Sequence, residues 1–105
     1  MSYQETSVLL KVIAHPSRLE ILDLLSCGDL CACDLLKYFQ FSQLTLSHHM
    51  KLLINHKIIS ANKMCNKQIY QLNLPLFKQL NEHLTSIYTS NKQCICQTIS
   101  KGDCQ

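Results

Sequence analysis

The chain has 105 residues, of which 47% are hydrophobic and seven are cysteine, with only two glycines, two prolines and a net charge of +3. A chain of this length forms one domain with a modest core, and the scarcity of glycine and proline favours a mostly helical fold. The weak positive charge excludes nucleic-acid binding through overall charge alone, so such binding requires a local basic surface. Because no stretch resembles a signal peptide or approaches the about 20 apolar residues that span a bilayer, we expect a cytoplasmic protein without membrane contact.

The first part of the chain predicts two helices. Apolar residues at helical spacing indicate a helix over residues 5–14 and a second helix that begins near Pro16 and ends near Gly28. Proline fits the first helical position, but the run from Ser17 to Glu20 also has the pattern of a capping box. The start of the second helix is therefore defined only to within one residue. His15, just before it, is expected to cap a helix less well than an acidic residue.

The stretch from Asp29 to Leu53 predicts a short helix, a turn and a second helix, for which Ser42 is a favourable N-cap. At about 100° per residue, one face of the second helix forms an inward stripe of Leu46, Met50 and Leu53. The opposite face carries polar and basic side chains together with one leucine: Leu44, Ser47, His48, Lys51 and Asn55. His49 lies about 60° from the inward stripe, so it fits both the core and the outer face. This arrangement is typical of a helix-turn-helix that reads the major groove of DNA.

A hairpin and a last helix complete the predicted domain, residues 1–89. Residues 58–63 and 68–72 indicate two strands joined by a turn over 64–67, with Asn66 at positive φ. Pro75 opens a helix with an apolar stripe of Phe77, Leu80, Leu84 and Ile87. That stripe fits either the domain's own core or a second copy of the chain. Residues 90–105, which include Cys94, Cys96 and Cys104, are polar and aperiodic, and we expect a mobile tail.

The cysteines predict a metal site. An odd number of cysteines without an export signal argues against a disulfide framework, so we expect reduced thiols that act as core residues or soft-metal ligands. Cys31 and Cys33 fall in the first turn of the short helix, where the helix N-terminus stabilises thiolates. Residues two apart on a regular helix point about 200° away from each other, so one ion bound by both would have to distort this turn. Because the turn leads into the reading helix, ligand binding and DNA binding are expected to compete.

Two motifs at this spacing carry a family resemblance that extends from about Glu5 through Leu72. Asp29-Leu30-Cys31-Ala32-Cys33-Asp34-Leu35, followed by Ser42-Gln43-Leu44-Thr45-Leu46-Ser47-His48-His49-Met50, resembles the ArsR/SmtB family and, within it, the arsenical-resistance repressors. The resemblance implies a homodimeric winged helix-turn-helix, mainly α with a small β-hairpin as the wing. It also implies DNA contacts from the reading helix and the wing, at Gln43, Leu44, Thr45, Ser47, His48, His49, Lys51, Lys63 and Lys67.

The function implied by the resemblance is a repressor, not an enzyme, that needs no cofactor and leaves operator DNA when arsenite or antimonite binds Cys31 and Cys33. Trivalent arsenic forms three bonds, and the best-known sites of the family place a third cysteine where this chain has Leu36. The third ligand is therefore open: Cys27 is the first substitute, Cys94 or Cys96 is the second, and an external thiol or hydroxide also fits.

Three alternatives remain at this point. One is a repressor of the same fold that responds to cadmium, lead or zinc, or to thiol oxidation, although zinc prefers four ligands. A thiol oxidoreductase normally shows a C-x-x-C motif on a βαβ background, which this sequence lacks. A metal carrier would not need a basic helix face.

Overall fold

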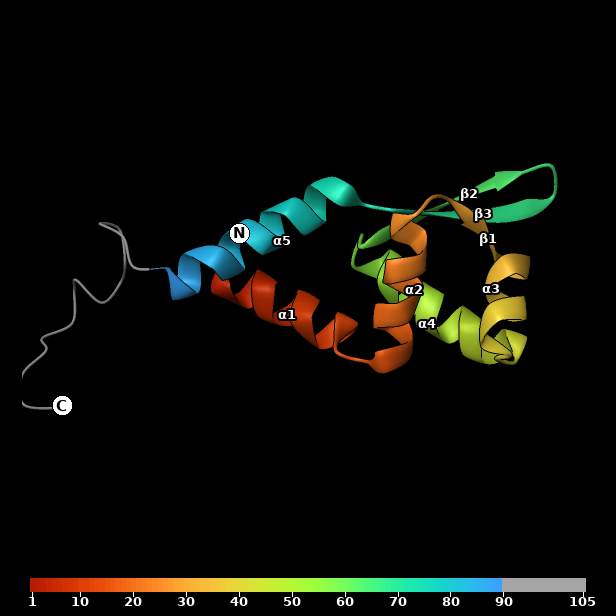
Figure 1. Ribbon diagram of the computed structural model, residues 1–105, viewed down its shortest axis with the longest axis horizontal. Coiled ribbons are helices and arrows are strands. Elements are labelled where there is room, and N and C mark those ends of the chain that lie inside the picture. Colours follow the sequence, from red (N-terminus) through yellow and green to blue (C-terminus); the bar gives the residue numbers. More distant parts are fainter. Residues whose placement is uncertain (90–105) are drawn as a thin grey trace, which may run out of the picture.

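The computed structural model describes residues 1–89; the predicted tail, with Cys94, Cys96 and Cys104, lies outside the described residues. Within the described part, the elements in chain order are α1 (Tyr3–Ile13), α2 (Pro16–Ser26), β1 (Leu30–Cys31), α3 (Ala32–Phe39), α4 (Gln43–Asn55), β2 (Ile59–Met64), β3 (Lys67–Leu72) and α5 (Leu74–Tyr88). Helices α1 and α5 form one end of the molecule, and α3, α4 and the sheet form the other (Figure 1). No helix in residues 1–89 is long and apolar enough to cross a membrane.

Side-chain caps shift the start of α1 from the predicted position. Helix α1 begins two residues early because Ser2 Oγ accepts the Glu5 N–H at 3.0 Å and the Glu5 carboxylate accepts the Ser2 N–H at 3.4 Å. This is a capping box that the apolar periodicity did not reveal.

Helix α2 begins at Pro16, and its N-cap is His15, whose Nδ1 accepts the Ser17 N–H at 3.1 Å. His15 therefore does cap the helix, with an imidazole nitrogen in the place of the usual side-chain oxygen, while the prediction that it caps less well than an acidic residue stays a prediction. The helix ends at Ser26, and Gly28 follows with φ 150°, so the prediction of a stop near Gly28 is confirmed.

The sheet has three strands rather than the predicted two, in the order β1-β3-β2 and antiparallel throughout. Strands β2 and β3 form the hairpin, joined by Cys65 and Asn66 at φ 51° and 65°. Asn66 at positive φ is confirmed, whereas Cys65 was not expected there; two such residues suit a tight hairpin turn. The two residues of β1 are too few to produce a recognisable pattern, and their pairing with Tyr70 and Ile69 of β3 forms only in the folded chain.

The core lies where α2, α3 and α4 meet the sheet. The inward stripe of α4 is confirmed, since Leu46, Met50 and Leu53 are 3%, 1% and 0% exposed. Leu35 of α3 is fully buried in the same cluster. Leu80 of α5 is 6% exposed within a single chain, so this part of the last helix packs on the domain's own core.

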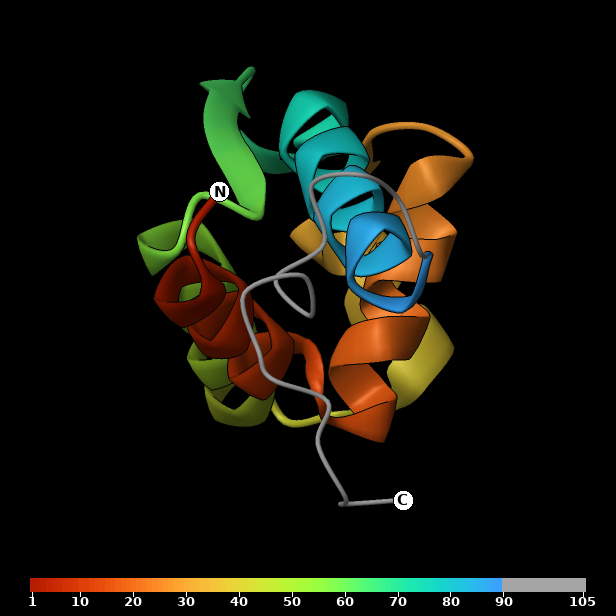
Figure 2. The same cartoon turned by 90° about the vertical axis from the view of Figure 1, so that its left-hand side faces the viewer.

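Helices α1 and α5 both extend to the end opposite the helix-turn-helix, which faces the viewer in Figure 2. The hydroxyl of Thr6 on α1 hydrogen-bonds Nδ1 of His83 on α5, and the ring of Tyr3 lies 5.4 Å from the His83 ring. These contacts hold the two terminal helices of one chain together.

Candidate DNA-reading surface and thiol site

The turn between α3 and α4 has a defined geometry. Gln40 adopts the left-handed conformation, with φ 56° and ψ 25°, and donates its N–H to the Leu36 carbonyl at 3.1 Å. The rings of Phe39 and Phe41 stack across the turn with centroids 4.8 Å apart and planes 6° apart. This packing sets the angle at which α4 leaves α3.

Helix α4 begins as predicted, with Ser42 as its N-cap. Ser42 Oγ accepts the Thr45 N–H at 3.1 Å, and the two hydroxyls lie 2.9 Å apart in a further hydrogen bond. Beyond the cap, one side of the helix is exposed, and we call it the reading face: Gln43, Leu44, Thr45, Ser47, His48 and Lys51. Leu44 is 81% exposed, so its side chain is available for contact on this face.

His49 does not belong to the reading face, and this corrects the sequence expectation. The side chain is only 6% exposed, and its Nδ1 accepts the Nε–H of Arg18 at 3.2 Å. Arg18 also donates to the carbonyl of Val12 at 2.7 Å, so the pair ties α4 to α1 and α2. Burial lowers the pKa of His49, and the neighbouring charges of His15, Arg18 and His48 lower it further.

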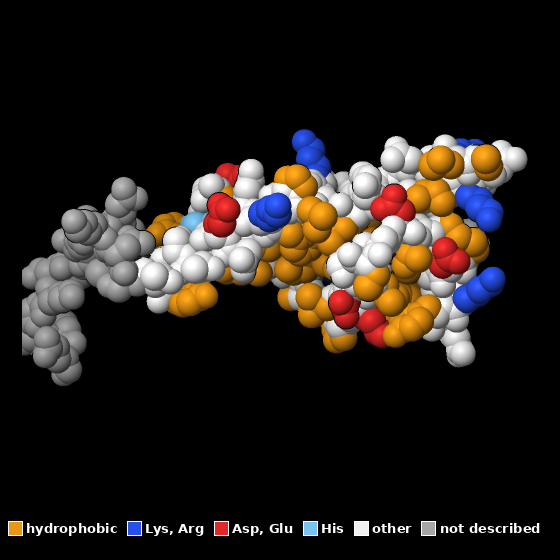
Figure 3. Space-filling model, turned by 45° about the horizontal axis from the view of Figure 1, so that its top comes forward, with side chains coloured by type: hydrophobic (Ala, Val, Ile, Leu, Met, Phe, Trp, Pro, Cys, Tyr) orange, Lys and Arg blue, Asp and Glu red, His pale blue; other side chains and the backbone are white. Residues whose placement is uncertain are grey.

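The wing carries the other predicted basic residues. Lys63 on β2 and Lys67 on β3 are both exposed close to the turn of the hairpin. On the face drawn in Figure 3, basic side chains lie at the end formed by the wing and the helix-turn-helix, where acidic side chains also occur, and further basic side chains lie over the middle of the molecule. The wing and α4 therefore present cations and hydrogen-bonding groups at the same end.

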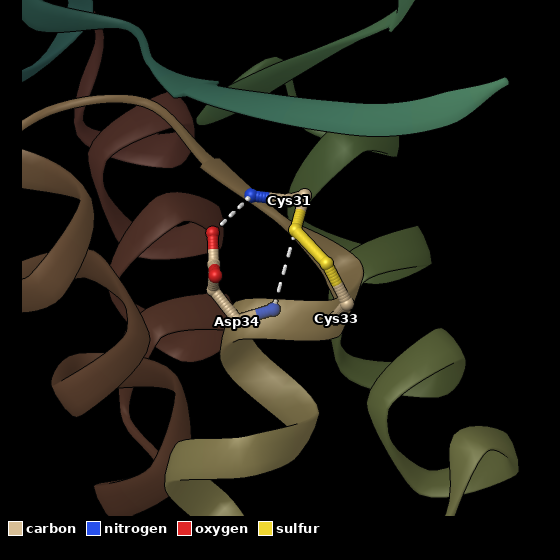
Figure 4. Close-up of a disulfide and its surroundings, with 3 residues drawn as sticks. All are labelled: Cys31, Cys33 and Asp34. Atoms are coloured by element: carbon tan, nitrogen blue, oxygen red, sulfur yellow. Dashed lines mark hydrogen bonds between the residues drawn. A yellow bond between two sulfur atoms is a disulfide. The ribbon is translucent and has the colours of Figure 1, made fainter. Parts of the chain in front are cut away.

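The predicted thiol pair lies at the N-terminus of α3. Cys31 is the N-cap, in an extended conformation, and Cys33 lies in the first helical turn, with Cα atoms 5.3 Å apart (Figure 4). Their sulfur atoms are joined in a disulfide, so the structure shows this pair in its oxidised form, whereas the sequence predicted reduced thiols. The expected angle of about 200° is also wrong, because it assumed that both residues are helical, whereas Cys31 precedes the helix.

Asp34 is a member of this site that the sequence reasoning missed. Its N–H donates to Cys31 Sγ at 3.3 Å, and its Oδ2 accepts the Cys31 N–H at 3.2 Å. A potential ligand atom from each of Cys31, Cys33 and Asp34 lies within 4.8 Å of the other two. The signal was available as a capping box, with Cys31 in the place of serine and an acidic residue three positions later.

The other cysteines of the described part lie apart from this site. Cys27 is exposed at the C-terminus of α2, where its sulfur is 4.0 Å from the Asp23 carbonyl, and it does not join the group around Cys31. Cys65 is exposed at the turn of the wing. The structure thus does not bring the first substitute ligand, Cys27, to the pair; Cys94 and Cys96 lie outside the described residues.

Comparisons with known proteins identify the family. Residues 15–61 match the family described as bacterial regulatory protein, arsR family. The chain is 55% identical to the arsenical resistance operon repressor of Staphylococcus xylosus, over 99% of this chain and 100% of that protein. The chain belongs to the arsR family. It is also 54% identical to the arsenical resistance operon repressor of Staphylococcus aureus, over 99% of this chain and 100% of that protein. As an arsR-family protein, it is a transcription regulator rather than an enzyme.

Solved structures share the fold of this arsR-family regulator. HlyU from Vibrio cholerae N16961 superposes with a TM-score of 0.69 at 29% identity, covering 84% of this chain and 98% of that chain. The ArsR-like transcriptional regulator from Rhodococcus sp. RHA1 gives a TM-score of 0.73 at 20% identity, covering 81% of this chain and 80% of that chain. The predicted winged helix-turn-helix fold is confirmed.

Proposed function

We propose that this arsR-family regulator represses an arsenical resistance operon in the cytoplasm, bound as a homodimer to operator DNA, and leaves the DNA when trivalent arsenic or antimony binds Cys31 and Cys33. The observation that carries the proposal is the position of two adjacent sulfur atoms at the N-terminus of α3, the first helix of the helix-turn-helix. The 55% identity with an arsenical resistance operon repressor supports the choice of ligand.

The reading face suits the major groove. Serine, threonine, glutamine and histidine side chains can hydrogen-bond base edges, and the exposed Leu44 can contact a thymine methyl group. Lys51, Lys63 and Lys67 suit phosphates, which position the protein without reading sequence. His49 is left out of this contact set because it is buried.

The proposed homodimer uses the outer faces of α1 and α5, where apolar side chains remain exposed. Val8 on α1 is 38% exposed and Ile87 on α5 is 53% exposed. Two reading helices in one dimer can engage two half-sites of an operator. We expect Val8→Asp and Ile87→Asp to give monomers with retained helicity and weak operator binding. Dimers that persist in sedimentation would contradict this choice of face.

The ligand acts through the cap of α3. In the reduced form, the helix N-terminus stabilises two thiolates, which are preferred ligands of soft metalloids. We propose that the Asp34 carboxylate supplies the third bond. That carboxylate then leaves the Cys31 N–H, so ligand binding breaks half of the capping box that starts α3. Since Cys31 also pairs with Ile69 of β3, the disturbance reaches the wing as well as the helix-turn-helix.

The experiment measures linkage on the full chain after reduction. Arsenite is titrated against the protein with sulfur-to-arsenic absorbance, with and without duplex DNA from the promoter of its own operon. Operator DNA must weaken arsenite binding by the same factor by which arsenite weakens DNA binding. Antimonite, cadmium, lead and zinc titrations show which ligand is preferred. DNA affinity that arsenite leaves unchanged would refute the proposal.

Three variants identify the third ligand. Asp34→Asn keeps the size of the side chain and removes its charge, so arsenite binding weakens if the carboxylate is the ligand. Cys27→Ser is the matched control at a cysteine that lies outside the group. Truncation after Asn91 removes the cysteines of the tail. Weakened binding in the truncated protein, with Asp34→Asn unaffected, would assign the third ligand to the tail.

A further inference from the structure

We propose that Cys31 and Cys33 form a reversible oxidation site, and that the disulfide form of the regulator stays on operator DNA while it is unable to respond to the metalloid. The inference rests on the proposed function, because it concerns control of the same thiols. The oxidant is a peroxide or a low-molecular-weight disulfide.

The two cysteines differ in access in a way that suits stepwise oxidation. Cys33 is exposed, whereas Cys31 is 6% exposed and held by its bonds to Asp34. The Cys33 thiolate attacks hydrogen peroxide, the O–O bond breaks, and a sulfenic acid and hydroxide form, the latter taking up a proton to give water. The Cys31 thiolate then attacks the sulfenic sulfur, the S–S bond forms and hydroxide leaves, again protonated to water. Two thiols thus lose two electrons and two protons to one peroxide, which is reduced to two waters.

The disulfide form keeps the architecture needed to bind DNA. With the bond formed, Cys31 Sγ still accepts the Asp34 N–H and Asp34 Oδ2 still accepts the Cys31 N–H, so the capping box of α3 is complete. The pairing of Cys31 with Ile69 and the burial of Leu35 are also present, and the reading face of α4 is exposed. Oxidation therefore leaves in place the contacts that we expect the metalloid to break.

The same bond removes the ligands. A disulfide has no thiolate to offer, and trivalent arsenic binds thiolates far better than disulfide sulfur. A disulfide needs no third donor, so the Asp34 carboxylate remains on the Cys31 N–H. The predicted result is a repressor that oxidant makes insensitive to the metalloid and that a dithiol reductant returns to its sensitive state.

The test uses the full chain in a two-thiol background that retains only Cys31 and Cys33. Its substitutions are Cys27→Ser, Cys65→Ser, Cys94→Ser, Cys96→Ser and Cys104→Ser. The reduced protein is first shown to bind promoter DNA and to leave it with arsenite. It is then treated with hydrogen peroxide, and mass spectrometry after digestion identifies the Cys31–Cys33 linkage. Fluorescence anisotropy is expected to show unchanged DNA affinity, loss of arsenite release, and recovery of release after dithiothreitol.

The matched control adds Cys33→Ser to this background, which removes the disulfide without removing Cys31. Peroxide should form no intramolecular linkage in this control. If oxidation without arsenite releases the protein from DNA, the inference is overturned, and that result favours a repressor that is switched by thiol oxidation. Arsenite release that survives complete disulfide formation would also overturn it. If the reduced two-thiol protein ignores arsenite while the reduced parent chain responds, one of the replaced cysteines is the third ligand, and the oxidation test is repeated in the parent chain. If the reduced parent chain also ignores arsenite, the proposed function fails, and the oxidation and DNA-binding measurements still decide whether the disulfide form binds DNA.

Discussion

Helices α3 and α4 of the helix-turn-helix begin at N-caps of the same geometry but of different chemistry. In α3 a sulfur atom, Cys31 Sγ, accepts the Asp34 N–H at 3.3 Å, and in α4 a hydroxyl, Ser42 Oγ, accepts the Thr45 N–H at 3.1 Å. Only the α3 cap has a second sulfur and a carboxylate beside it among the described residues. The cap of α3 therefore contains groups that the proposed function assigns to a soft ligand, whereas the cap of α4 contains only hydroxyl groups, which are poor ligands for soft metalloids.

This difference places the proposed response to the ligand on α3 and the proposed recognition of DNA on α4. The α4 cap and the reading face bear no cysteine, so under the proposed function we expect them to keep their structure when the ligand binds. The α3 cap can open, and α3 carries the turn that orients α4. Such a division allows release from DNA without any ligand contact to the DNA-binding side chains.

The largest effect is expected when the α3 cap is given the chemistry of the α4 cap. Cys31→Ser places a hydroxyl at the N-cap, where serine is among the preferred residues, so helix α3 and DNA affinity should be retained. Serine is a poor ligand for a soft metalloid, so arsenite should no longer release the variant from DNA. Anisotropy with reduced protein measures both. Arsenite release equal to that of the parent would place the switch elsewhere in the chain.

The next effect tests whether the burial of α3 is needed for the fold. Leu35 is fully buried, and Leu35→Ala should lower the free energy of unfolding by about 2–5 kcal/mol, as is typical of large-to-small core changes. Leu44→Ala is the matched control, since Leu44 is 81% exposed on α4 and should change stability little. Urea denaturation of both variants makes the comparison, and equal losses would contradict the two assigned environments.

Base reading should depend on α4 and not on the wing. Ser47→Ala or His48→Ala should weaken operator binding by about 1–3 kcal/mol for each lost base contact, with little change on random DNA. Lys63→Ala and Lys67→Ala should weaken both DNAs alike and reduce the salt dependence, because lysine there would contact phosphate. Titrations at several salt concentrations distinguish these results. Equal losses on both DNAs for the α4 variants would remove those residues from base reading.

A smaller effect is expected at the α4 cap itself. Ser42→Ala removes the acceptor for the Thr45 N–H and should cost about 1 kcal/mol of stability. Because this cap does not take part in ligand binding, the ratio of DNA affinities with and without arsenite should stay at the parent value. A changed ratio would mean that the two caps are not independent.

The smallest effect is expected with pH, through His49, which anchors α4 to α2. The pKa of His49 is lowered by burial, so between its ordinary value of 6.5 and its folded value the unfolded chain binds a proton that the folded chain does not. Stability should therefore decrease as the pH falls below about 6.5 and level off below the folded pKa. Urea midpoints across this range should show a weaker dependence in His49→Asn, whose amide oxygen can accept from Arg18. Identical pH profiles would exclude His49 as the source.

Features that depend on neighbouring residues could be predicted from the sequence alone. The inward stripe of α4, the Ser42 cap, the turn at Asn66 and the end of α2 before Gly28 were all predicted, because each depends on neighbours a few residues away. The helix-turn-helix and the thiol motif also carried the family assignment. The capping boxes at Ser2 and Cys31 were local as well, but the first lay outside the apolar pattern and the second used a sulfur in the place of an oxygen.

Other features were decided only by tertiary structure. His49 lies between the two faces of α4, and Arg18, 31 positions earlier in the chain, is what makes it a core residue. Strand β1 exists because Leu30 and Cys31 meet β3, and this pairing holds Cys31 extended ahead of the helix, where its sulfur meets that of Cys33. The periodicity of apolar residues predicts the secondary structure of one segment. The contacts of His49 and Cys31 depend instead on which distant segments pack against them in the folded chain.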